Sequence, residues 1–137
     1  MKAVFADTLC WVAVARPDDQ WHEPSLRARE EIGRVRIVTT DEVLSEFLAA
    51  LSKGGAALRT HAVAMVRAII ANPNVTVVPQ SRLSFLTGLG LYERRADKTY
   101  SLVDCTSMEA MRSAGLTEVL TNDGHFAQEG YSVLIRQ

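Results

Sequence analysis

The sequence predicts an α/β fold, a three-layer α/β/α sandwich with a short, mostly parallel central sheet. Short runs rich in β-branched residues alternate along the chain with longer stretches of helical character. The runs are apolar throughout, which is typical of parallel strands that are buried on both faces. Because crossovers between parallel strands are right-handed, the loops after the strands are expected at one edge of the sheet, where ligands of such sheets bind.

Five short apolar runs are the predicted strands. They cover residues 2–6, 35–38, 75–78, 119–121 and 133–135. Valine and isoleucine, which favour a pleated and half-buried surface, dominate most of them. Pro79 follows the third run and marks its end, because proline cannot donate to a strand ladder.

Helices are predicted from apolar residues at intervals of three and four and, in one case, from a charged stretch. They cover residues 8–15, 23–33, 39–53, 56–71, 81–96 and 102–114, and a turn or short helix is expected over 123–126. Gly33, Gly54 and Gly115 are expected to stop three of them, because glycine readily adopts the backbone of a helix C-terminus. Gly88 and Gly90 are expected to be weak points of their helix.

The helix that begins near residue 39 has the clearest start signal. Thr39-Thr40-Asp41-Glu42 matches a capping box, with Thr39 as the N-cap and Glu42 as the third helical residue. The apolar residues that follow are expected to form a buried face, and they are Val43, Leu44, Phe47, Leu48 and Leu51.

The bulk composition predicts one compact domain over residues 1–137. Hydrophobic residues make up 47% of the chain, which is enough for a sizeable core. No apolar stretch reaches the roughly 18 residues of a membrane span, and the N-terminal run is too short for a signal peptide. The net charge of −1 gives no sign of nucleic-acid binding by bulk electrostatics, so such a contact must rely on a local patch or a bound metal.

The two cysteines, Cys10 and Cys105, form no disulfide framework pattern. We expect both to be buried thiols, because free cysteine behaves as a small hydrophobic residue. Reduced thiols are typical of the cytosol, so we expect a cytoplasmic protein.

Four acidic residues occupy positions that can bring their carboxylates together. Asp7 follows the first predicted strand and Asp123 follows the fourth, so both are expected at the same sheet edge. Glu46 and Asp104 lie early in two predicted helices. Oxygen ligands from distant parts of a chain hold hard cations such as Mg²⁺ or Mn²⁺. These four residues are therefore the candidate metal ligands.

Each of these acids also has a purely structural interpretation. Asp7 can be the N-cap of the next helix, unless Thr8 takes that position and leaves the carboxylate free. Glu46 can be a solvated surface residue, but it lies at the edge of the buried helix face. Glu42 lies nearly opposite that face and already has a role in the capping box. We therefore favour Glu46 over Glu42 as the ligand.

Asp104 is the most informative of the four acids. Its neighbours are small or apolar, so it is expected on a largely buried helix, where an unpaired carboxylate is costly. The alternative is a first-turn acid favoured by the helix dipole. Asp123 lies in Asn122-Asp123-Gly124, which is a turn signal in its own right. His125 can contact phosphate or a leaving group, but we interpret it as structural and leave it out of the candidate set.

With these residues the chain resembles the PIN-domain ribonucleases and, among them, the VapC toxins of VapBC toxin–antitoxin pairs. The resemblance extends over essentially the whole chain and rests on four fragments in order, namely residues 4–8 (VFADT), 40–46 (TDEVLSE), 97–105 (DKTYSLVDC) and 120–126 (LTNDGHF). The family's four acidic positions are matched by Asp7, Glu46, Asp104 and Asp123. Its polar residue before the last acid falls on Thr121 or Asn122, and we prefer Thr121.

The resemblance implies cleavage of single-stranded or structured RNA that depends on Mg²⁺ or Mn²⁺. It also implies a homodimer and a small VapB-like antitoxin whose tail blocks the active site. Because water activated by a metal needs no RNA 2′-hydroxyl, products with 5′-phosphate and 3′-hydroxyl ends are expected. Thr8 and Thr121 are candidates for orienting water or phosphate through their hydroxyls.

Several residues near these fragments have open roles. A basic cluster before Asp104 either meets phosphate or is a solvated helix end, and it consists of Arg94, Arg95 and Lys98. Three aromatic residues are candidates for stacking on bases, with packing favoured for the first of them, and they are Trp11, Trp21 and Tyr100. Asp97 is an added acid that either supports the ligands or is a loop residue.

Two alternatives compete with a nuclease. Aspartyl-phosphate phosphotransferases also have an Asp after the first strand. Haloacid-dehalogenase-like enzymes, however, need a second Asp where this chain has Leu9, and receiver domains need a late Lys, whereas no lysine follows Lys98. The other alternative is a catalytically silent PIN-like module that binds RNA or a protein. The retained acids count against it, because a scaffold has little reason to gather buried carboxylates.

Overall fold

The computed structural model describes all 137 residues and contains one five-stranded sheet. Its strands are β1 (Ala3–Ala6), β2 (Arg36–Thr40), β3 (Val75–Val78), β4 (Glu118–Leu120) and β5 (Ser132–Val133). Their order is β3-β2-β1-β4-β5, and every neighbouring pair is parallel. All five predicted strands are present, and the sheet is parallel throughout.

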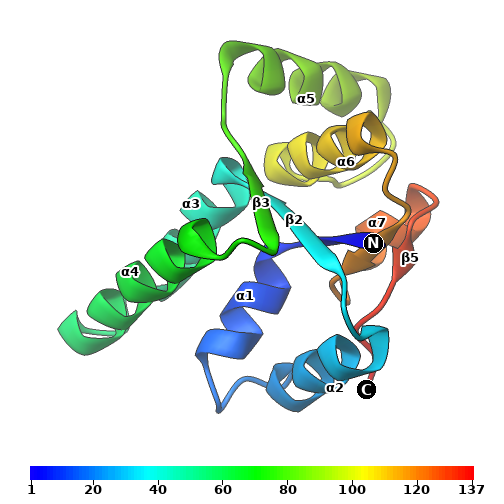
Figure 1. Ribbon diagram of the computed structural model, residues 1–137. Coiled ribbons are helices and arrows are strands. Elements are labelled where there is room, and N and C mark those ends of the chain that lie inside the picture. Colours follow the sequence, from blue (N-terminus) through cyan, green and yellow to red (C-terminus); the bar gives the residue numbers. More distant parts are fainter.

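Seven helices surround the sheet. They are α1 (Thr8–Ala15), α2 (His22–Ile32), α3 (Asp41–Leu51), α4 (Ala56–Ala71), α5 (Arg82–Arg94), α6 (Leu102–Ala114) and α7 (Gly124–Gln128). In Figure 1, α5 and α6 lie on one side of the strands and α1 and α2 lie on the other, while α4 projects from the body of the molecule. The predicted three-layer α/β/α arrangement is confirmed. None of the helices combines the length and the apolarity that crossing a bilayer requires.

The chain reverses its direction across the sheet at β1. From β1 it runs outward through β2 to β3, and then it crosses back to add β4 and β5 on the other side. Ligands of open α/β sheets bind in the crevice at such a reversal point. β1 and β4 flank this crevice, with Phe5 opposite Val119 and Ala6 opposite Leu120. The segments that follow these two strands therefore emerge side by side.

The core includes both cysteines. Cys10 and Cys105 are free and fully buried, as the sequence predicts. Burial raises the pKa of Cys10 to about 12 and that of Cys105 to about 11. Both thiols are therefore protonated at neutral pH, and they serve as small hydrophobic residues and not as nucleophiles.

The start of α3 differs from the prediction. The helix begins at Asp41, and its N-cap is Thr40, whose hydroxyl accepts the backbone N–H of Val43 at 3.0 Å. The prediction of Thr39 as N-cap is wrong, because β2 stays paired with β3 through Thr40. Thr39 is instead fully buried within the strand, where its hydroxyl donates to the carbonyl oxygen of Ala6 at 2.9 Å.

This shift changes the role of Glu42, which becomes the second helical residue. It is therefore outside a capping box, and its carboxylate accepts the hydroxyl of Ser84 in α5 at 3.0 Å. The buried face of α3 is otherwise as predicted, except that Leu48 is 36% exposed because it lies at the margin of the apolar arc. A capping box between Ser81 and Ser84 begins α5.

Gly88 is a point of close approach between α5 and α6. A Cβ atom at this position would lie 2.5 Å from Cγ2 of Thr106 and 3.2 Å from the backbone nitrogen of Thr106. The glycine is therefore required by the packing of the two helices, beyond being a weak point of α5. At Gly90 the only neighbour of an added Cβ is the end of the flexible Arg94 side chain, at 3.3 Å.

We predict that Gly88→Ala lowers the free energy of unfolding by about 1–3 kcal/mol, because α5 must move away from the backbone of α6. Gly90→Ala is the matched control, and it should raise stability by about 0.5–1 kcal/mol through helix propensity alone. Urea unfolding followed by circular dichroism measures both effects. Equal effects of the two substitutions would contradict the close contact at Gly88.

Candidate active site

Asp7 lies deepest among the acids at the carboxyl edge of the sheet. It follows β1, is 5% exposed, and occupies the N-cap position of α1 without a capping hydrogen bond from its side chain. Thr8 is the first helical residue, so the alternative in which Thr8 caps the helix is wrong. The carboxylate of Asp7 is nevertheless not used as a cap. It accepts the hydroxyl of Thr121 at 3.0 Å.

Thr121 joins the segments that follow β1 and β4. Its side chain is fully buried, and its hydroxyl oxygen also accepts the backbone N–H of Asp123 at 3.1 Å. Asn122 turns elsewhere, because its amide donates to the carbonyl oxygen of Ile135 at 2.6 Å. Thr121 is therefore the polar residue that faces Asp7.

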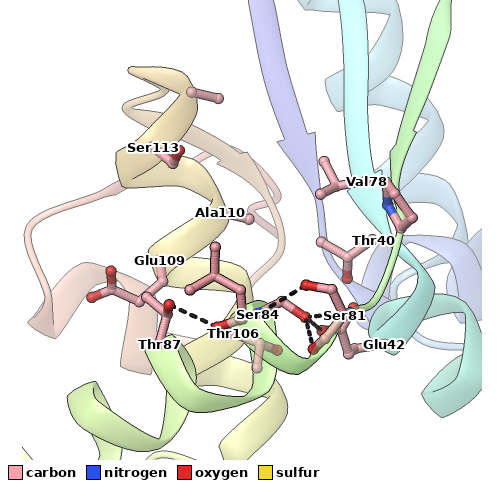
Figure 2. A pocket seen from close by; sticks show the side chains of 13 residues that line it. Thr40, Glu42, Val78, Ser81, Ser84, Thr87, Thr106, Glu109, Ala110 and Ser113 are labelled. Carbon is pink, nitrogen blue, oxygen red and sulfur yellow. Dashed lines mark hydrogen bonds between the residues drawn. The ribbon is translucent and has the colours of Figure 1, made fainter.

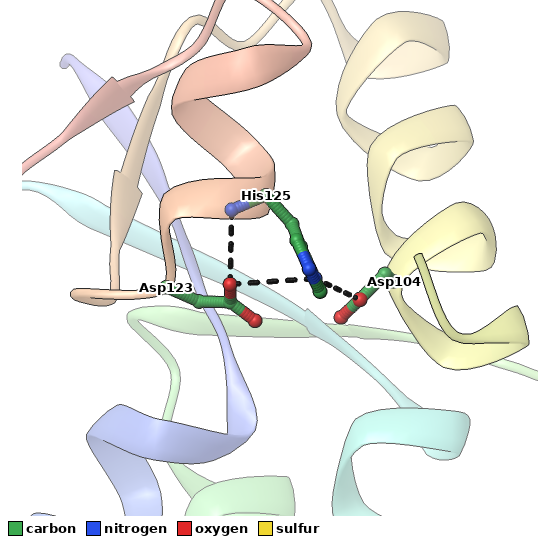
Figure 3. Close-up of side chains that lie close together, drawn as sticks. All are labelled: Asp104, Asp123 and His125. Carbon is green, nitrogen blue, oxygen red and sulfur yellow. Dashed lines mark hydrogen bonds and ion pairs between the residues drawn. The ribbon is translucent and has the colours of Figure 1, made fainter. Parts of the chain in front are cut away.

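Asp104, Asp123 and His125 form a compact cluster (Figure 3). Asp104 is the third residue of α6, and Asp123 is the N-cap of α7, so the starts of two helices bring the carboxylates together. Nδ1 of His125 lies 2.9 Å from Oδ2 of Asp104 and 3.4 Å from Oδ1 of Asp123. Each residue offers one potential ligand atom, and the three atoms lie within 4.8 Å of one another.

His125, which we interpreted from the sequence as structural, is thus a member of this cluster. Its Nδ1 faces the two carboxylates, while Nε2 contacts the hydroxyl of Thr99 at 3.1 Å. The only signal in the sequence was its position two residues after Asp123, in the turn that β4 delivers to this edge. Its distance to Asp104 depends on tertiary structure and has no local signature.

Glu46 approaches the acidic site from α3. Its carboxylate accepts the hydroxyl of Thr8, which directs it toward the start of α1. The charges of Glu46 and Asp104 both act on the carboxyl group of Asp7. The structure therefore brings Asp7, Glu46 and Asp104 into electrostatic contact, and Thr121 links Asp7 to the turn that carries Asp123.

The electrostatic cost of this arrangement is largest at Asp7. Burial raises the pKa of its carboxyl group to about 7, and the negative charges of Asp104 and Glu46 add to the rise. Hydrogen bonds from the backbone of Thr8 and the hydroxyl of Thr121 oppose it. Without a cation, Asp7 is therefore about half protonated near neutral pH.

The donor set fits a divalent cation. Carboxylate oxygens are the ligands that Mg²⁺ and Mn²⁺ prefer, and an imidazole nitrogen also suits transition metals. A cation would offset the repulsion between the acids and stabilise the ionised form of Asp7. Asp104, Asp123 and His125 offer ligand atoms within 4.8 Å of one another, and the charges of Asp104 and Glu46 act on the nearby carboxyl group of Asp7.

The basic cluster before Asp104 is neutralised to a large extent by acidic partners. Arg95 pairs with Glu129 at 2.8 Å, and Arg94 pairs with Glu109 at 3.3 Å. Lys98 makes only a loose ion pair with its neighbour in sequence, at 3.9 Å. Of the three basic residues, Lys98 is therefore the one whose charge is least engaged by protein groups.

Two of the three aromatic candidates for base stacking are buried. Trp11 is 4% exposed and donates its indole N–H to the hydroxyl of Thr39 at 3.2 Å. Tyr100 is 5% exposed, and its hydroxyl donates to Glu129 at 3.0 Å. Both are packing residues in this structure, which leaves the partly buried Trp21 as the only one with an accessible surface.

A separate cavity of about 310 Å³ lies between the start of α3, the end of β3, and the helices α5 and α6 (Figure 2). Glu42 lines this cavity beside Ser84, whereas none of the four predicted acids does. The side chains of Glu42 and Glu46 therefore lie at different sites in the fold.

The chain is similar to known proteins in sequence pattern and in structure. The family model described as PIN domain matches residues 4–129. The crystal structure of VapC20 from Mycobacterium tuberculosis, described as a toxin that cleaves the sarcin-ricin loop, is similar over 93% of this chain and 95% of that one. The TM-score is 0.82 and the sequence identity is 26%. No curated protein matches the chain.

We predict that Asp7→Asn stabilises the metal-free protein and does so increasingly as the pH rises from about 4 to 7. The folded-state pKa of Asp7, about 7, lies above that of an unfolded aspartate, so ionisation destabilises the folded wild type, whereas asparagine has no charge to bury. The difference in unfolding free energy should vanish below about pH 4 and reach up to about 4 kcal/mol above about pH 7.

Urea unfolding with EDTA, at about pH 5 and about pH 8, measures this difference. Asp18→Asn, at an acid whose side chain is 78% exposed, is the control and should be neutral at both pH values. An effect of Asp7→Asn that is the same at both pH values would contradict the buried and uncompensated carboxylate.

Proposed function

The chain belongs to the PIN-domain family, and on that premise we propose that it is a metal-dependent endoribonuclease and the toxin of a toxin–antitoxin pair. It hydrolyses RNA phosphodiester bonds with water that is activated by a divalent cation in the acidic site. The similarity to VapC20, a toxin that cleaves the sarcin-ricin loop, supports RNA as the substrate and makes a structured RNA loop the first target to test.

One observation carries this proposal, which is the convergence of acids from distant segments at one sheet edge. They are Asp7 after β1, Glu46 in α3, Asp104 in α6 and Asp123 before α7. Like charges in a poorly solvated place repel one another, and such an arrangement is typical of a functional site. Burial raises the pKa of Asp7, the charges of Asp104 and Glu46 add to the rise, and a bound cation would oppose it.

The proposed ligands are the three aspartates Asp7, Asp104 and Asp123, and Glu46 either joins them or holds a ligand water. The bound cation supplies positive charge beside the scissile phosphate and an activated water for attack in line with the leaving oxygen. Because the attack does not use the RNA 2′-hydroxyl, the products carry 5′-phosphate and 3′-hydroxyl ends.

The threonines support this ligand set. Thr121 keeps Asp7 directed toward the site and ties it to the turn of Asp123 through a second hydrogen bond. Thr8 holds Glu46 in the same way. We propose that both threonines act mainly by orienting carboxylates, and that contact with water or phosphate follows once a cation and RNA are bound.

We propose Mg²⁺ or Mn²⁺ as the cation, and the histidine favours Mn²⁺. A site made of oxygen ligands alone suits Mg²⁺, whereas an imidazole nitrogen suits a transition metal. Nδ1 of His125 is within reach of both Asp104 and Asp123. This nitrogen can bind a metal in the neutral tautomer that carries the ring proton on Nε2.

Exposed apolar side chains support the proposed protein partners. Val63 and Ile70 of α4 are 43% and 58% exposed, and Phe85 and Tyr92 of α5 are 43% and 51% exposed. Groups of such residues mark interaction sites. We propose that these two helices serve a homodimer and a small VapB-like antitoxin whose tail blocks the site. The free thiols fit a reducing compartment, so we propose a cytoplasmic location.

The function is tested by cleavage of a sarcin–ricin loop oligonucleotide and of labelled total RNA with Mn²⁺ or Mg²⁺. We predict discrete fragments with 5′-phosphate ends, lost with EDTA and reduced about a hundredfold or more by Asp104→Asn. The variant Asp18→Asn, at a largely exposed acid between α1 and α2, should cleave like the wild type. Intact RNA with folded, antitoxin-free protein would instead favour a binding module.

We further predict that His125→Asn raises the Mn²⁺ concentration needed for half-maximal cleavage by about tenfold and the Mg²⁺ concentration much less, because the substitution removes an imidazole nitrogen. Titration of each metal in the cleavage assay measures this. A shift of the same size for both metals would mean that His125 does not contribute its nitrogen to the site.

A further inference from the structure

A partly buried carboxylate, Glu129, joins three segments that surround the acidic site. Arg95 follows the last residue of α5, Tyr100 precedes the N-cap of α6, and Glu129 is the C-cap residue of α7. Arg95 and Glu129 are 34 residues apart in the sequence, and Tyr100 and Glu129 are 29 apart. The side chains of Arg95, Tyr100 and Glu129 meet across these separations.

The contact is strong for its type. The guanidinium of Arg95 donates from Nε to Oε1 of Glu129 at 2.9 Å and from Nη2 to Oε2 at 2.8 Å, which is a bidentate pair. The hydroxyl of Tyr100 donates to Oε1 at 3.0 Å. The side chain of Glu129 is only 14% exposed. Hydrogen bonding to Arg95 lowers the pKa of the Glu129 carboxyl group, so the carboxylate is charged.

This network reaches the acidic site through His125. The ring of Tyr100 packs against the imidazole with the ring centres 5.3 Å apart, and the hydroxyl of Thr99 contacts Nε2 at 3.1 Å. The opposite nitrogen, Nδ1, lies 2.9 Å from Asp104. Thr99 and Tyr100 thus set the orientation of the imidazole, and Glu129 holds these two residues against α7.

The same segment also carries Asp104. Tyr100 is followed by Ser101, whose hydroxyl accepts the backbone N–H of Asp104 at 3.0 Å, while the Asp104 carboxylate accepts the backbone N–H of Ser101 at 3.0 Å. The start of α6 is therefore rigid from Ser101 onward. Fixing Tyr100 to Glu129 consequently fixes Asp104 relative to Asp123 and His125 on α7.

We propose that Glu129 is a positioning residue for the metal site, which it serves by locking residues 95–101 to α7 through Arg95 and Tyr100. The inference rests on the proposed function, since it assumes that the acidic site holds a cation. Glu129 does not contact the cation or RNA. It sets the separation of Asp104 from Asp123 and the orientation of His125, and outer groups of this kind typically change metal affinity by about 10–100-fold.

The chain offers a matched control in Glu109 of α6. Its side chain is 7% exposed, and it is also paired with two arginines, at 3.3 Å to Arg94 and 2.6 Å to Arg112. Glu109 therefore resembles Glu129 in burial and in charge pairing, but none of its hydrogen bonds reaches His125 or Thr99. Removing the charge of either Glu109 or Glu129 should destabilise the protein, because each loses its ion pairs. Only the ion pair of Glu129, however, holds Thr99 and Tyr100 beside the site.

The test compares the wild type with Glu129→Gln, Tyr100→Phe and Glu109→Gln, each as the full chain. Calorimetric titration with MnCl₂ gives the affinity for Mn²⁺, urea unfolding gives the stability, and ¹H–¹⁵N spectra of the imidazole of His125 report its environment without any metal. Tyr100→Phe is included because it removes only one hydroxyl and keeps the ring, so it should fold even if Glu129→Gln does not.

We expect Glu129→Gln to weaken Mn²⁺ binding by about 10–100-fold and Tyr100→Phe by a smaller factor, both with shifted resonances of His125. Glu109→Gln should lose stability but keep its Mn²⁺ affinity within about twofold. Unchanged Mn²⁺ affinity in Glu129→Gln, or an equal loss in Glu109→Gln, would overturn the positioning role. If the wild type does not bind Mn²⁺, the proposed function is overturned. In that case the spectra decide the positioning role, and it is overturned as well if the His125 resonances move in neither Glu129→Gln nor Tyr100→Phe.

Discussion

The parallel pairing of β1 with β4 is the constraint on which the rest of the site depends. These strands are separated by more than a hundred residues, yet their ends stand next to each other because the chain reverses at the centre of the sheet. Asp7 and Thr121 then meet through a hydrogen bond of 3.0 Å. The remaining acids lie on helices that begin at the same edge, so the topology brings several negative charges close together.

These like charges repel one another in a place with little solvent, which is an electrostatic cost to the fold. The protein meets part of it with neutral donors, since hydroxyls of Thr8 and Thr121 bind two of the carboxylates and backbone N–H groups bind two more. His125 places a ring nitrogen near Asp104 and Asp123. Burial still raises the pKa of Asp7, and the charges of Asp104 and Glu46 add to the rise. A divalent cation is the simplest group that offsets it.

Much of the fold can be predicted from the sequence, because strands and helices are encoded by local patterns. The helices α1, α4 and α6 and the strand β3 begin and end at the predicted residues. The N-cap of α3 was misplaced by one residue, since two adjacent threonines look alike and the choice depends on how far β2 pairs with β3. Local sequence holds no information about that pairing.

The same distinction applies to the site. Asp7 and Asp123 are predictable because they follow strands, and Asp104 because its neighbours are apolar. The role of His125 depends on its distance to a residue 21 positions earlier, and that of Glu129 on an arginine 34 positions earlier. Such contacts follow from tertiary packing. Glu129 lies between Gln128 and Gly130, in a short polar stretch that resembles ordinary surface sequence.

The central claim is that the gathered carboxylates form a cation site and not merely a set of helix caps. The most direct test is a ¹³C NMR titration of the carboxyl group of Asp7, with and without Mg²⁺. The account predicts a pKa near 7 without Mg²⁺ and a fall by at least about two units when Mg²⁺ is added, because the cation favours the ionised form. A pKa that Mg²⁺ leaves unchanged would contradict the cation site.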